Sequence, residues 1–318
     1  MKNPTSRRSF LWNVGAGSLA AVAAESWAQA AQPQAPDAKI LGEAGVGTAE
    51  RPKGVWQQVS DRKIRVGIAG FGVCQFGAAF GFQDHPNVTV AAVTDLFPDR
   101  CAALARACRC EKTYPSLEEM VKDDALEAVF VATDAPSHVR HCVGAIQRGK
   151  HVASAVPAAF GSLEEAQQLF ETVKSTGRKY MMFETSAFHQ DCHAMRQIYR
   201  AGGFGKLVYS EGEYFHYMPT PIGSFRDWRV GLPPQWYPTH SNAYYVCVTG
   251  GSFTEVCCMG MPSVVEHLLP EKNRYKNPFG TEIALLRTSG AAWRGWLSVG
   301  TRRAGKSRWA ACVGSGGR

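Results

Sequence analysis

Three absences narrow the kinds of protein that this sequence can encode. The chain has no run of about 20 strongly apolar residues, the length that a membrane-spanning helix needs. It has no C-x-x-C pair: Cys108 and Cys110 are separated by one residue, and Cys257 and Cys258 are adjacent. These spacings do not suit a metal ion and favour buried free thiols. We therefore expect no stable membrane insertion, no metal and no disulfide framework.

The third absence is of acidic residues near the end of the chain. The formal net charge is +8, and the last thirty residues carry six basic residues and no acid. The first thirty-one residues contribute Lys2, Arg7 and Arg8 against Glu25. The residues between these ends are close to neutral, which gives no electrostatic reason to expect a nucleic acid or an anionic lipid as partner.

Residues 1–30 have the pattern of a twin-arginine signal peptide. Ser6-Arg-Arg-Ser-Phe-Leu11 precedes a short apolar stretch, and Ala28-Gln-Ala30 provides a cleavage site. This route carries folded proteins, so we expect a periplasmic or otherwise exported protein. A chance Arg-Arg pair in a general secretory signal is the alternative. Residues 31–61, rich in Gln, Pro, Ala and Gly, predict a linker.

Residues 62–185 alternate between apolar strands and amphipathic helices. The pattern predicts strands at 64–70, 88–94, 126–133, 151–154 and 179–184, and helices at 98–108, 136–147 and 162–175. Ser116 and Ser162 each open a capping box. Continuous apolar strands between helices indicate a parallel sheet covered on both faces. We predict a doubly wound α/β domain.

A glycine-rich turn follows the first strand and suggests a dinucleotide site. Gly70 allows a tight turn, and Gly72 lets the backbone approach a pyrophosphate. The third glycine of the usual fingerprint falls at Gln75, so Gly77 is the candidate for relieving helix–strand crowding. Asp95 ends the second strand, where a carboxylate binds ribose hydroxyls and favours NAD over NADP. A glycine-rich turn without a nucleotide is the alternative.

From Lys63 to Arg287 the sequence resembles the Gfo/Idh/MocA oxidoreductases, which include glucose-fructose oxidoreductase and inositol dehydrogenase. The resemblance rests on the glycine turn, Asp95, the segments 131–138 and 149–157, and Gly202-Gly-Phe-Gly-Lys-Leu207. It implies a second domain, at 186–288, with a large open, mostly antiparallel sheet for substrate and oligomer contacts. It implies hydride transfer between a nicotinamide and a sugar, cyclitol or related polyol. One relative is a redox-neutral glycosidase that uses bound NAD.

The cofactor-binding candidates follow from the glycine turn and the family motifs. They are Gly70, Phe71, Gly72, Val73, Cys74, Gln75, Asp95, Thr133, Asp134, Ser137, His138 and Pro157. We expect NAD, with NADP as the alternative, and we expect His138 to line the nicotinamide pocket.

Two departures from the family concern proton transfer. The resemblance places a Glu-Lys-Pro motif after the fifth strand, but this chain has Ala155-Val-Pro157, and neither alanine nor valine can exchange a proton. The second departure is in the family's Asp-x-x-x-His region, where the resemblance places His240 but this chain has Tyr237 rather than a carboxylate nearby. The resemblance makes His240 the first candidate for general acid or base, with Tyr237 second and Glu184 third. A histidine that only packs or orients a neighbour is the alternative.

Aromatic and basic residues gather between 209 and 245, as expected for carbohydrate contacts, although sheet packing accounts for some of them. An acidic or phosphate-bearing substrate that pairs with Arg226 and Arg229 is an open alternative. Residues 289–318 have no regular period, and we predict an irregular tail that follows a frameshift or truncation and leaves the sheet incomplete. A genuine short variant is the alternative.

These observations predict a nicotinamide-nucleotide-binding oxidoreductase that acts on a carbohydrate-like molecule with a tightly held cofactor. Two alternatives stay open: a redox-neutral NAD-dependent glycosidase, and a non-catalytic homologue that binds nucleotide or sugar. We expect any homo-oligomer to form through the sheet of the second domain.

Overall fold

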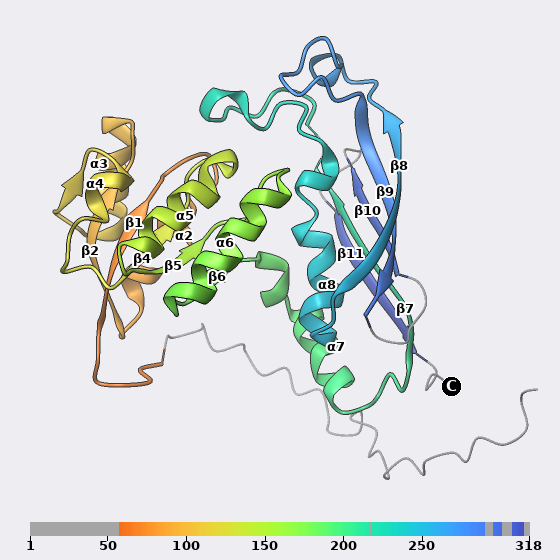
Figure 1. Ribbon diagram of the computed structural model, residues 1–318, viewed down its shortest axis with the longest axis horizontal. Coiled ribbons are helices and arrows are strands. Elements are labelled where there is room, and N and C mark those ends of the chain that lie inside the picture. Colours follow the sequence, from red (N-terminus) through yellow and green to blue (C-terminus); the bar gives the residue numbers. More distant parts are fainter. Residues whose placement is uncertain (1–56, 217, 290–294, 301–306, 315–318) are drawn as a thin grey trace, which may run out of the picture. The chain divides into compact units, whose positions relative to one another are not determined.

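The computed structural model describes residues 57–216, 218–289, 295–300 and 307–314 (Figure 1). The chain divides into residues 1–50 and 51–318, and every described residue belongs to the second unit. The predicted signal peptide and most of the predicted linker lie outside the described residues. None of the helices in the described ranges combines the length and the apolar character that crossing a bilayer requires.

The first domain is built on a six-stranded parallel sheet. Its strands are β1 Ile64–Ala69, β2 Val88–Thr94, β3 Thr113–Tyr114, β4 Ala128–Val131, β5 His151–Ser154 and β6 Tyr180–Met182. They lie in the order β3-β2-β1-β4-β5-β6, and every neighbouring pair is parallel. The order reverses between β1 and β4, as in the doubly wound fold that the sequence predicts.

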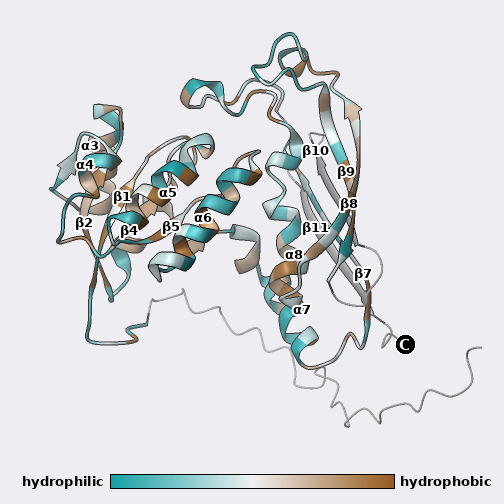
Figure 2. Cartoon of the chain, viewed as in Figure 1, coloured by the Kyte–Doolittle hydropathy of each residue, from teal (hydrophilic) through white to brown (hydrophobic). Residues whose placement is uncertain are grey.

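The helices predicted at 98–108, 136–147 and 162–175 are present, with ends within two residues of the prediction. The helices of this domain are α2 Phe76–Ala79, α3 Pro98–Cys108, α4 Leu117–Met120, α5 His138–Gln147 and α6 Leu163–Thr176. The hydroxyls of Ser116 and Ser162 accept hydrogen bonds from the amides of Glu119 and Glu165, at 3.3 and 3.1 Å. Both predicted helix caps are therefore confirmed. Figure 2 shows hydrophilic and hydrophobic residues on different sides of α6.

Two hydrophobic clusters, one rich in aliphatic residues and one rich in phenylalanine, hold the sheet between its helices. In the second cluster the ring of Phe130 lies 5.0, 5.4 and 5.6 Å from the rings of Phe82, Phe183 and Phe80. Rings at these separations add directional contacts to the burial of apolar area. This packing fixes the strand ends that carry the candidate site.

Several elements are short. The strand predicted at 179–184 is β6, which spans Tyr180–Met182. The helix after the glycine turn, α2, has only four residues. The strand predicted from Leu126 is β4, which starts at Ala128, because a turn holds the preceding residues. In that turn the amide of Ala125 donates to the Asp123 carboxylate and the amide of Leu126 donates to the Asp123 carbonyl.

The second domain contains a five-stranded sheet. Its elements are α7 Gln190–Arg200, β7 Leu207–Phe215, α8 Thr239–Thr249, β8 Phe253–Pro262, β9 Phe279–Thr288, β10 Gly295–Gly300 and β11 Ser307–Gly314. The strand order is β11-β7-β10-β9-β8, and only β7 and β10 pair in parallel. The predicted open, mostly antiparallel sheet is thus confirmed. α8 packs so closely on β7 that a Cβ at Gly212 would lie 2.3 Å from the Ser241 carbonyl oxygen.

Strands β10 and β11 come from residues 289–318, where the sequence analysis predicted an irregular tail. Both pair with β7, so this segment is not irregular throughout. Each strand contains a tryptophan and a valine, residue types that favour strands even without a clear hydrophobic period. The frameshift itself stays a prediction.

Short 3₁₀ segments connect these elements. They are Phe82–Asp84, Ala135–Ser137, Thr185–Phe188, Phe225–Asp227, Pro234–Trp236 and Glu266–Leu268. The long connection from β7 to α8 contains two of them and reaches the first domain, where Trp228 and Trp236 pack against Phe160 at ring distances of 5.6 and 5.3 Å. This apolar contact fixes the connection against the ends of the parallel strands.

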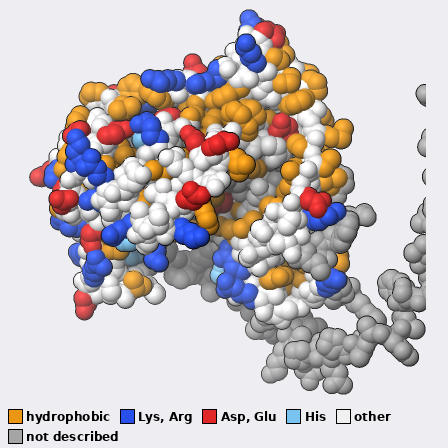
Figure 3. Space-filling view, viewed as in Figure 1, with side chains coloured by type: hydrophobic (Ala, Val, Ile, Leu, Met, Phe, Trp, Pro, Cys, Tyr) orange, Lys and Arg blue, Asp and Glu red, His pale blue; other side chains and the backbone are white. Residues whose placement is uncertain are grey.

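Nine cysteines, from Cys74 to Cys258, are free. Cys108 and Cys110 are buried, as expected. The expectation of burial was wrong for Cys257 and Cys258, which are exposed because β8 is an edge strand of the second sheet. On the face shown in Figure 3, basic and acidic side chains are interspersed, which agrees with the nearly neutral charge of the middle of the chain.

Candidate functional site

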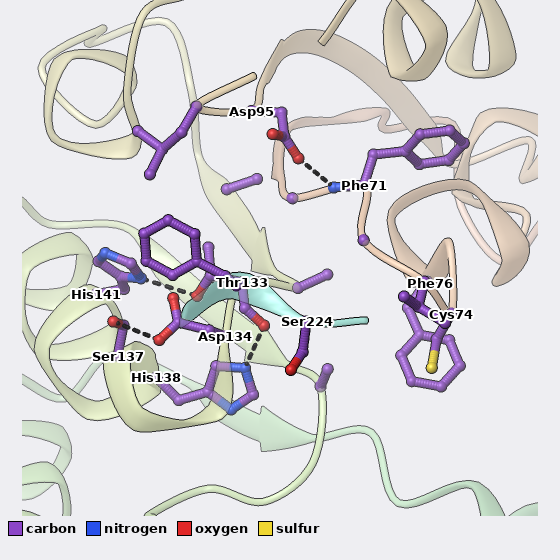
Figure 4. A pocket seen from close by; sticks show the side chains of 18 of the residues that line it. Phe71, Cys74, Phe76, Asp95, Thr133, Asp134, Ser137, His138, His141 and Ser224 are labelled. Carbon is purple, nitrogen blue, oxygen red and sulfur yellow. Dashed lines mark hydrogen bonds between the residues drawn. The ribbon is translucent and has the colours of Figure 1, made fainter. Parts of the chain in front are cut away.

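The candidate site is a cavity of about 280 Å³ at the carboxyl ends of the parallel strands. Its walls include residues that follow β1, β2, β4 and β5, and residues 223–226, 228 and 229 of the connection from β7 to α8. The cavity lies where the strand order reverses, the position at which open α/β sheets bind ligands. Figure 4 shows Asp95 and Phe71 on one side of it and the Thr133–His138 segment on the other.

The glycine turn has the geometry that a pyrophosphate requires. Gly70 has φ +103°, and a Cβ there would lie 2.3 Å from the Ala132 carbonyl oxygen. A Cβ at Gly72 would meet no atom within 4 Å, so the backbone borders open space. A Cβ at Gly77 would lie 2.6 Å from the Gly70 carbonyl oxygen, which is the crowding that the sequence analysis assigned to this glycine. Gln75 adopts φ +49°, a conformation that glycine would take more easily.

Asp95 anchors the glycine turn to the end of β2. Its Oδ2 accepts a hydrogen bond of 2.7 Å from the Phe71 amide (Figure 4). Its Oδ1 accepts one of 2.9 Å from the Phe97 amide. A carboxylate has about four lone-pair positions, so both oxygens can still accept a further donor. Asp95 therefore combines a structural role with free capacity on the cavity side.

The segment after β4 is braced by side-chain pairs. Arg140 donates to Nε2 of His141, which leaves Nδ1–H of His141 to donate to the Thr133 hydroxyl at 2.8 Å. The Ser137 hydroxyl donates to Asp134 at 2.9 Å. Burial, aided by the charge of Arg140, lowers the pKa of His141 to about 4, so its ring is neutral near pH 7.

His138 connects the ends of β4 and β5. Its Nδ1 lies 2.7 Å from the Pro157 carbonyl oxygen, and its Nε2 lies 3.1 Å from the Thr133 carbonyl oxygen. The side chain is almost fully buried, and burial lowers its pKa. Since both nitrogens face backbone carbonyls, the ring holds two strand ends in place while it lines the cavity.

After β5, Ala155 and Val156 form an apolar wall of the cavity. Neither can exchange a proton, so the cavity offers no ammonium where the family motif has lysine. Pro157 follows Val156 through a cis peptide bond and does not itself line the cavity.

The catalytic candidates form a group beside the cavity, in which His240 and Glu184 are buried and Tyr237 is partly buried. Nδ1–H of His240 donates to Oε1 of Glu184 at 2.6 Å, and the Ser186 amide donates to the same oxygen at 2.8 Å. The rings of Tyr214 and Tyr237 lie 4.6 and 5.5 Å from the His240 ring. His240, Tyr237 and Glu184 do not line the cavity.

Opposing effects act on the ionisation of this group. Burial raises the pKa of Glu184, but the hydrogen bond and charge of His240 and the Ser186 amide outweigh burial, so the pKa is lowered overall. Burial raises the pKa of Tyr237 well above its ordinary value. Glu184 is thus the anionic member and Tyr237 a neutral one at neutral pH.

Eleven of the twelve cofactor-binding candidates line one cavity, and Pro157 is the exception. The sequence analysis did not single out Arg100, Leu117, Glu118 or Ser224, and no local motif marks them. Phe225, Arg226, Trp228 and Arg229 were grouped as candidate carbohydrate contacts; the structure places them on the wall of the cavity that the glycine turn lines.

Comparison with protein families agrees with this geometry. Residues 64–184 match the GFO_IDH_MocA model, described as an oxidoreductase family with an NAD-binding Rossmann fold. Among curated relatives, a glycosyl hydrolase family 109 protein of Saccharopolyspora erythraea is 28% identical over 284 residues, covering 82% of this chain and 59% of the relative. A glycosyl hydrolase family 109 protein of Akkermansia muciniphila is 26% identical over 307 residues, covering 86% and 64%. The chain thus spans about three fifths of the length of these relatives.

Solved structures share the fold. The scyllo-inositol dehydrogenase of Lactobacillus casei, with bound NAD(H) and scyllo-inositol, has a TM-score of 0.66 at 18% identity, covering 80% of this chain and 75% of that one. The myo-inositol 2-dehydrogenase of Lactobacillus plantarum has a TM-score of 0.67 at 18% identity with the same coverage. At this identity the likeness concerns the fold.

Proposed function

We propose that the chain is a nicotinamide-dinucleotide-dependent enzyme acting on a sugar, cyclitol or related polyol. The premise is the match of residues 64–184 to the Gfo/Idh/MocA oxidoreductase family with its NAD-binding Rossmann fold. The observation that carries the proposal is the cavity at the carboxyl edge of the parallel sheet, with open space beside Gly72. The inositol ligand of a structural neighbour and the names of the curated relatives support a carbohydrate substrate.

The residues present fit a dinucleotide. The backbone at Gly72 can receive the pyrophosphate, and Asp95 has the capacity to accept ribose hydroxyls and would repel a 2′-phosphate, which favours NAD over NADP. Val156 and His138 would border the nicotinamide. When bound, this cofactor supplies a hydride acceptor or donor.

We propose His240 as the group that moves the substrate proton. Glu184 accepts from Nδ1–H and so fixes the tautomer in which Nε2 carries the lone pair. The same arrangement, an anion orienting an imidazole, stabilises the ring when it takes up a proton. Tyr237, whose raised pKa keeps its hydroxyl protonated, is the second candidate.

A substitution at His240 tests this role. His240→Gln keeps an N–H donor for Glu184 but cannot exchange a proton near pH 7, so turnover should fall by about 10²–10⁴ with bound nucleotide unchanged. If His240→Gln turned over at the wild-type rate, the proton-transfer role would belong to Tyr237 or to water. Loss of nucleotide would assign His240 a structural role. Val156→Lys is the complementary variant, since restoring the ammonium should raise any dehydrogenase activity.

The second candidate function is a redox-neutral glycosidase, in which the cofactor is regenerated in each cycle. The curated relatives named above carry a glycosyl hydrolase name, and the cavity lacks the lysine expected of the dehydrogenases. A screen of sugars, polyols and aryl glycosides separates the candidates. A change in nicotinamide absorbance supports the dehydrogenase, and product release without such a change supports the glycosidase. The absence of both signals supports a binding protein without catalysis.

We also propose that the protein is exported folded, with its nucleotide retained. The paired arginines of residues 1–30 support this route. An exported enzyme has no replenished NAD pool, so the purified protein should hold nearly one nucleotide per chain. Denaturing it and assaying the supernatant for NAD and NADP tests retention. If neither is present and added NAD does not bind, the proposed function is wrong.

A further inference from the structure

The segment Gly223–Arg229, which we name the clasp segment, belongs to the second domain but lines the dinucleotide cavity. The cavity wall also includes Leu96, Phe97 and Arg100, which directly follow Asp95 at the end of β2. In a Rossmann domain the carboxylate at this position marks the adenosine ribose. The residues after β2 therefore border the adenosine side, and Phe225 of the clasp segment contacts Phe97 among them.

Four side chains connect these two parts of the wall in one stack. The Arg100 guanidinium lies 4.5 Å from the centre of the Phe97 ring, and the Arg226 guanidinium lies 5.0 Å from that of Phe225. Between them the Phe97 and Phe225 rings meet edge to face, with centres 6.2 Å apart. Cations over the outer ring faces and an edge-to-face contact between the rings are each attractive. The stack thus links the first domain to the clasp segment.

The backbone of the clasp segment is held by its own domain. Arg226 and Asp227 have φ +52° and +53°, consecutive left-handed conformations that are unfavourable for side-chain-bearing residues. Arg274 donates to the Arg226 carbonyl at 2.8 Å, and the Tyr275 hydroxyl donates to the Trp228 carbonyl at 2.7 Å. Such strain persists where surrounding contacts fix it, and it presents Phe225 toward Phe97.

The two ends of the clasp segment contact the first domain differently. At the nicotinamide side Trp228 is buried against Phe160, with ring centres 5.6 Å apart. At the adenosine side Phe97 is 40% exposed, and its contact with Phe225 lies at the solvent-facing edge. Opening at the adenosine side therefore breaks exposed contacts, namely the Phe97–Phe225 ring contact and the 3.8 Å contact of the Arg229 guanidinium with Cys74 Sγ, whereas opening at the other side would expose a buried core.

We propose that Phe225 and Phe97 are nucleotide-retaining residues: together they close the adenosine side of the cavity and slow the release of the dinucleotide. This inference rests on the proposed function, because it needs a dinucleotide in the cavity. It adds that the second domain supplies part of the cofactor site and sets how long the cofactor stays.

The test is the rate at which bound NAD exchanges. The full-length protein is loaded with radiolabelled NAD, mixed with excess unlabelled NAD and sampled by rapid filtration. Phe225→Ala and Phe97→Ala should each raise the dissociation rate about tenfold, the order of one aromatic contact. The double variant should resemble either single one, since both remove the same contact. Phe225→Tyr should stay within about twofold of wild type, because it keeps the ring.

Phe170→Ala is the matched control, because Phe170 is an exposed phenylalanine on α6 that does not line the cavity. It should leave the exchange rate unchanged, and equal melting temperatures would show that all variants are folded. Exchange at the wild-type rate in Phe225→Ala, or effects that multiply in the double variant, would overturn the inference while the cofactor claim stands. If the wild-type protein binds no NAD, the proposed function fails and this inference with it.

Discussion

At the scale of single residues, the cavity depends on positions where a side chain is absent or held neutral. Gly70 and Gly72 both lie in the turn after β1, but for different reasons: the first adopts φ +103° close to Ala132, where a side chain would be strained, and the second borders empty space. His141 braces Thr133 as a neutral ring inside the fold. A substitution at each of these positions should change a different measured property: nucleotide binding, thermal stability or the pH dependence of stability.

Gly72→Val should remove nucleotide binding without unfolding the protein. The new side chain points into open space, so the melting temperature should change little, whereas the pyrophosphate loses its place. Gly70→Ala is the contrasting variant, since its Cβ would meet the Ala132 carbonyl; we expect a stability loss of roughly 3 kcal/mol. Thermal melts and NAD titrations of both variants measure the difference. Equal melting temperatures for the two would contradict this assignment.

His141 predicts a loss of stability in mild acid. An unfolded histidine titrates near its model value of 6.5, but burial lowers the pKa in the folded protein to about 4. As the pH falls from 6.5 to 4, the unfolded chain binds a proton that the folded chain does not, so the free energy of unfolding drops. The loss approaches about 3 kcal/mol. Urea denaturation at pH 7, 5 and 4 should show that the free energy of unfolding falls more steeply with decreasing pH in wild type than in His141→Gln. Parallel declines in the two proteins would refute the role given to His141.

At the scale of elements, local sequence signals predicted most of the first domain. Caps at Ser116 and Ser162, and the apolar runs of β1 and β2, agree with the structure because each rests on contacts within a few residues. The glycine turn and Asp95 were found because they follow a strand and precede a helix. Arg100 and Leu117 were missed, since their place on the cavity wall depends on tertiary packing. The exposed Cys257–Cys258 pair was missed because it depends on which strand lies at the sheet edge.

The cap of α6 gives a quantitative test at this scale. Ser162→Ala removes the acceptor for the Glu165 amide and should lower the free energy of unfolding by about 1 kcal/mol. Ser175→Ala, in the last turn of the same helix, is the control and should stay within about 0.5 kcal/mol of wild type. Urea denaturation measures both. Equal losses in the two variants would show that the cap contributes nothing specific.

At the scale of the whole molecule, the second sheet presents an exposed apolar face. Cys257, Met259 and Met261 of β8 pair with Leu285, Ile283 and Thr281 of β9, so these side chains share the face opposite the buried Glu282 and Ala284. Met259 is 75% exposed. A contiguous apolar face of this kind is typical of a protein–protein contact. We propose that the chain self-associates through it.

A charge on this face should therefore separate the subunits. Met259→Lys places an ammonium at the centre of the face, where burial against a second copy would cost several kcal/mol. Sedimentation velocity should report an oligomer for wild type and a monomer for the variant. Val59→Lys, at an exposed apolar residue outside both sheets, should keep the wild-type mass. A monomeric wild type, or an oligomeric Met259→Lys, would rule out this interface.

The strand order of the second sheet also has a consequence for the nascent chain. β7 hydrogen-bonds on one side to β10 and on the other to β11, and both partners come from residues 295–314. The parallel sheet can assemble as soon as β6 has left the ribosome. β7, in contrast, keeps both backbone edges unpaired until β10 and β11 have been translated. Unpaired edges of this kind attract other strands. The second domain therefore cannot be completed before residues 295–314 have left the ribosome, and a chaperone that shields β7 until then should raise the yield of folded protein.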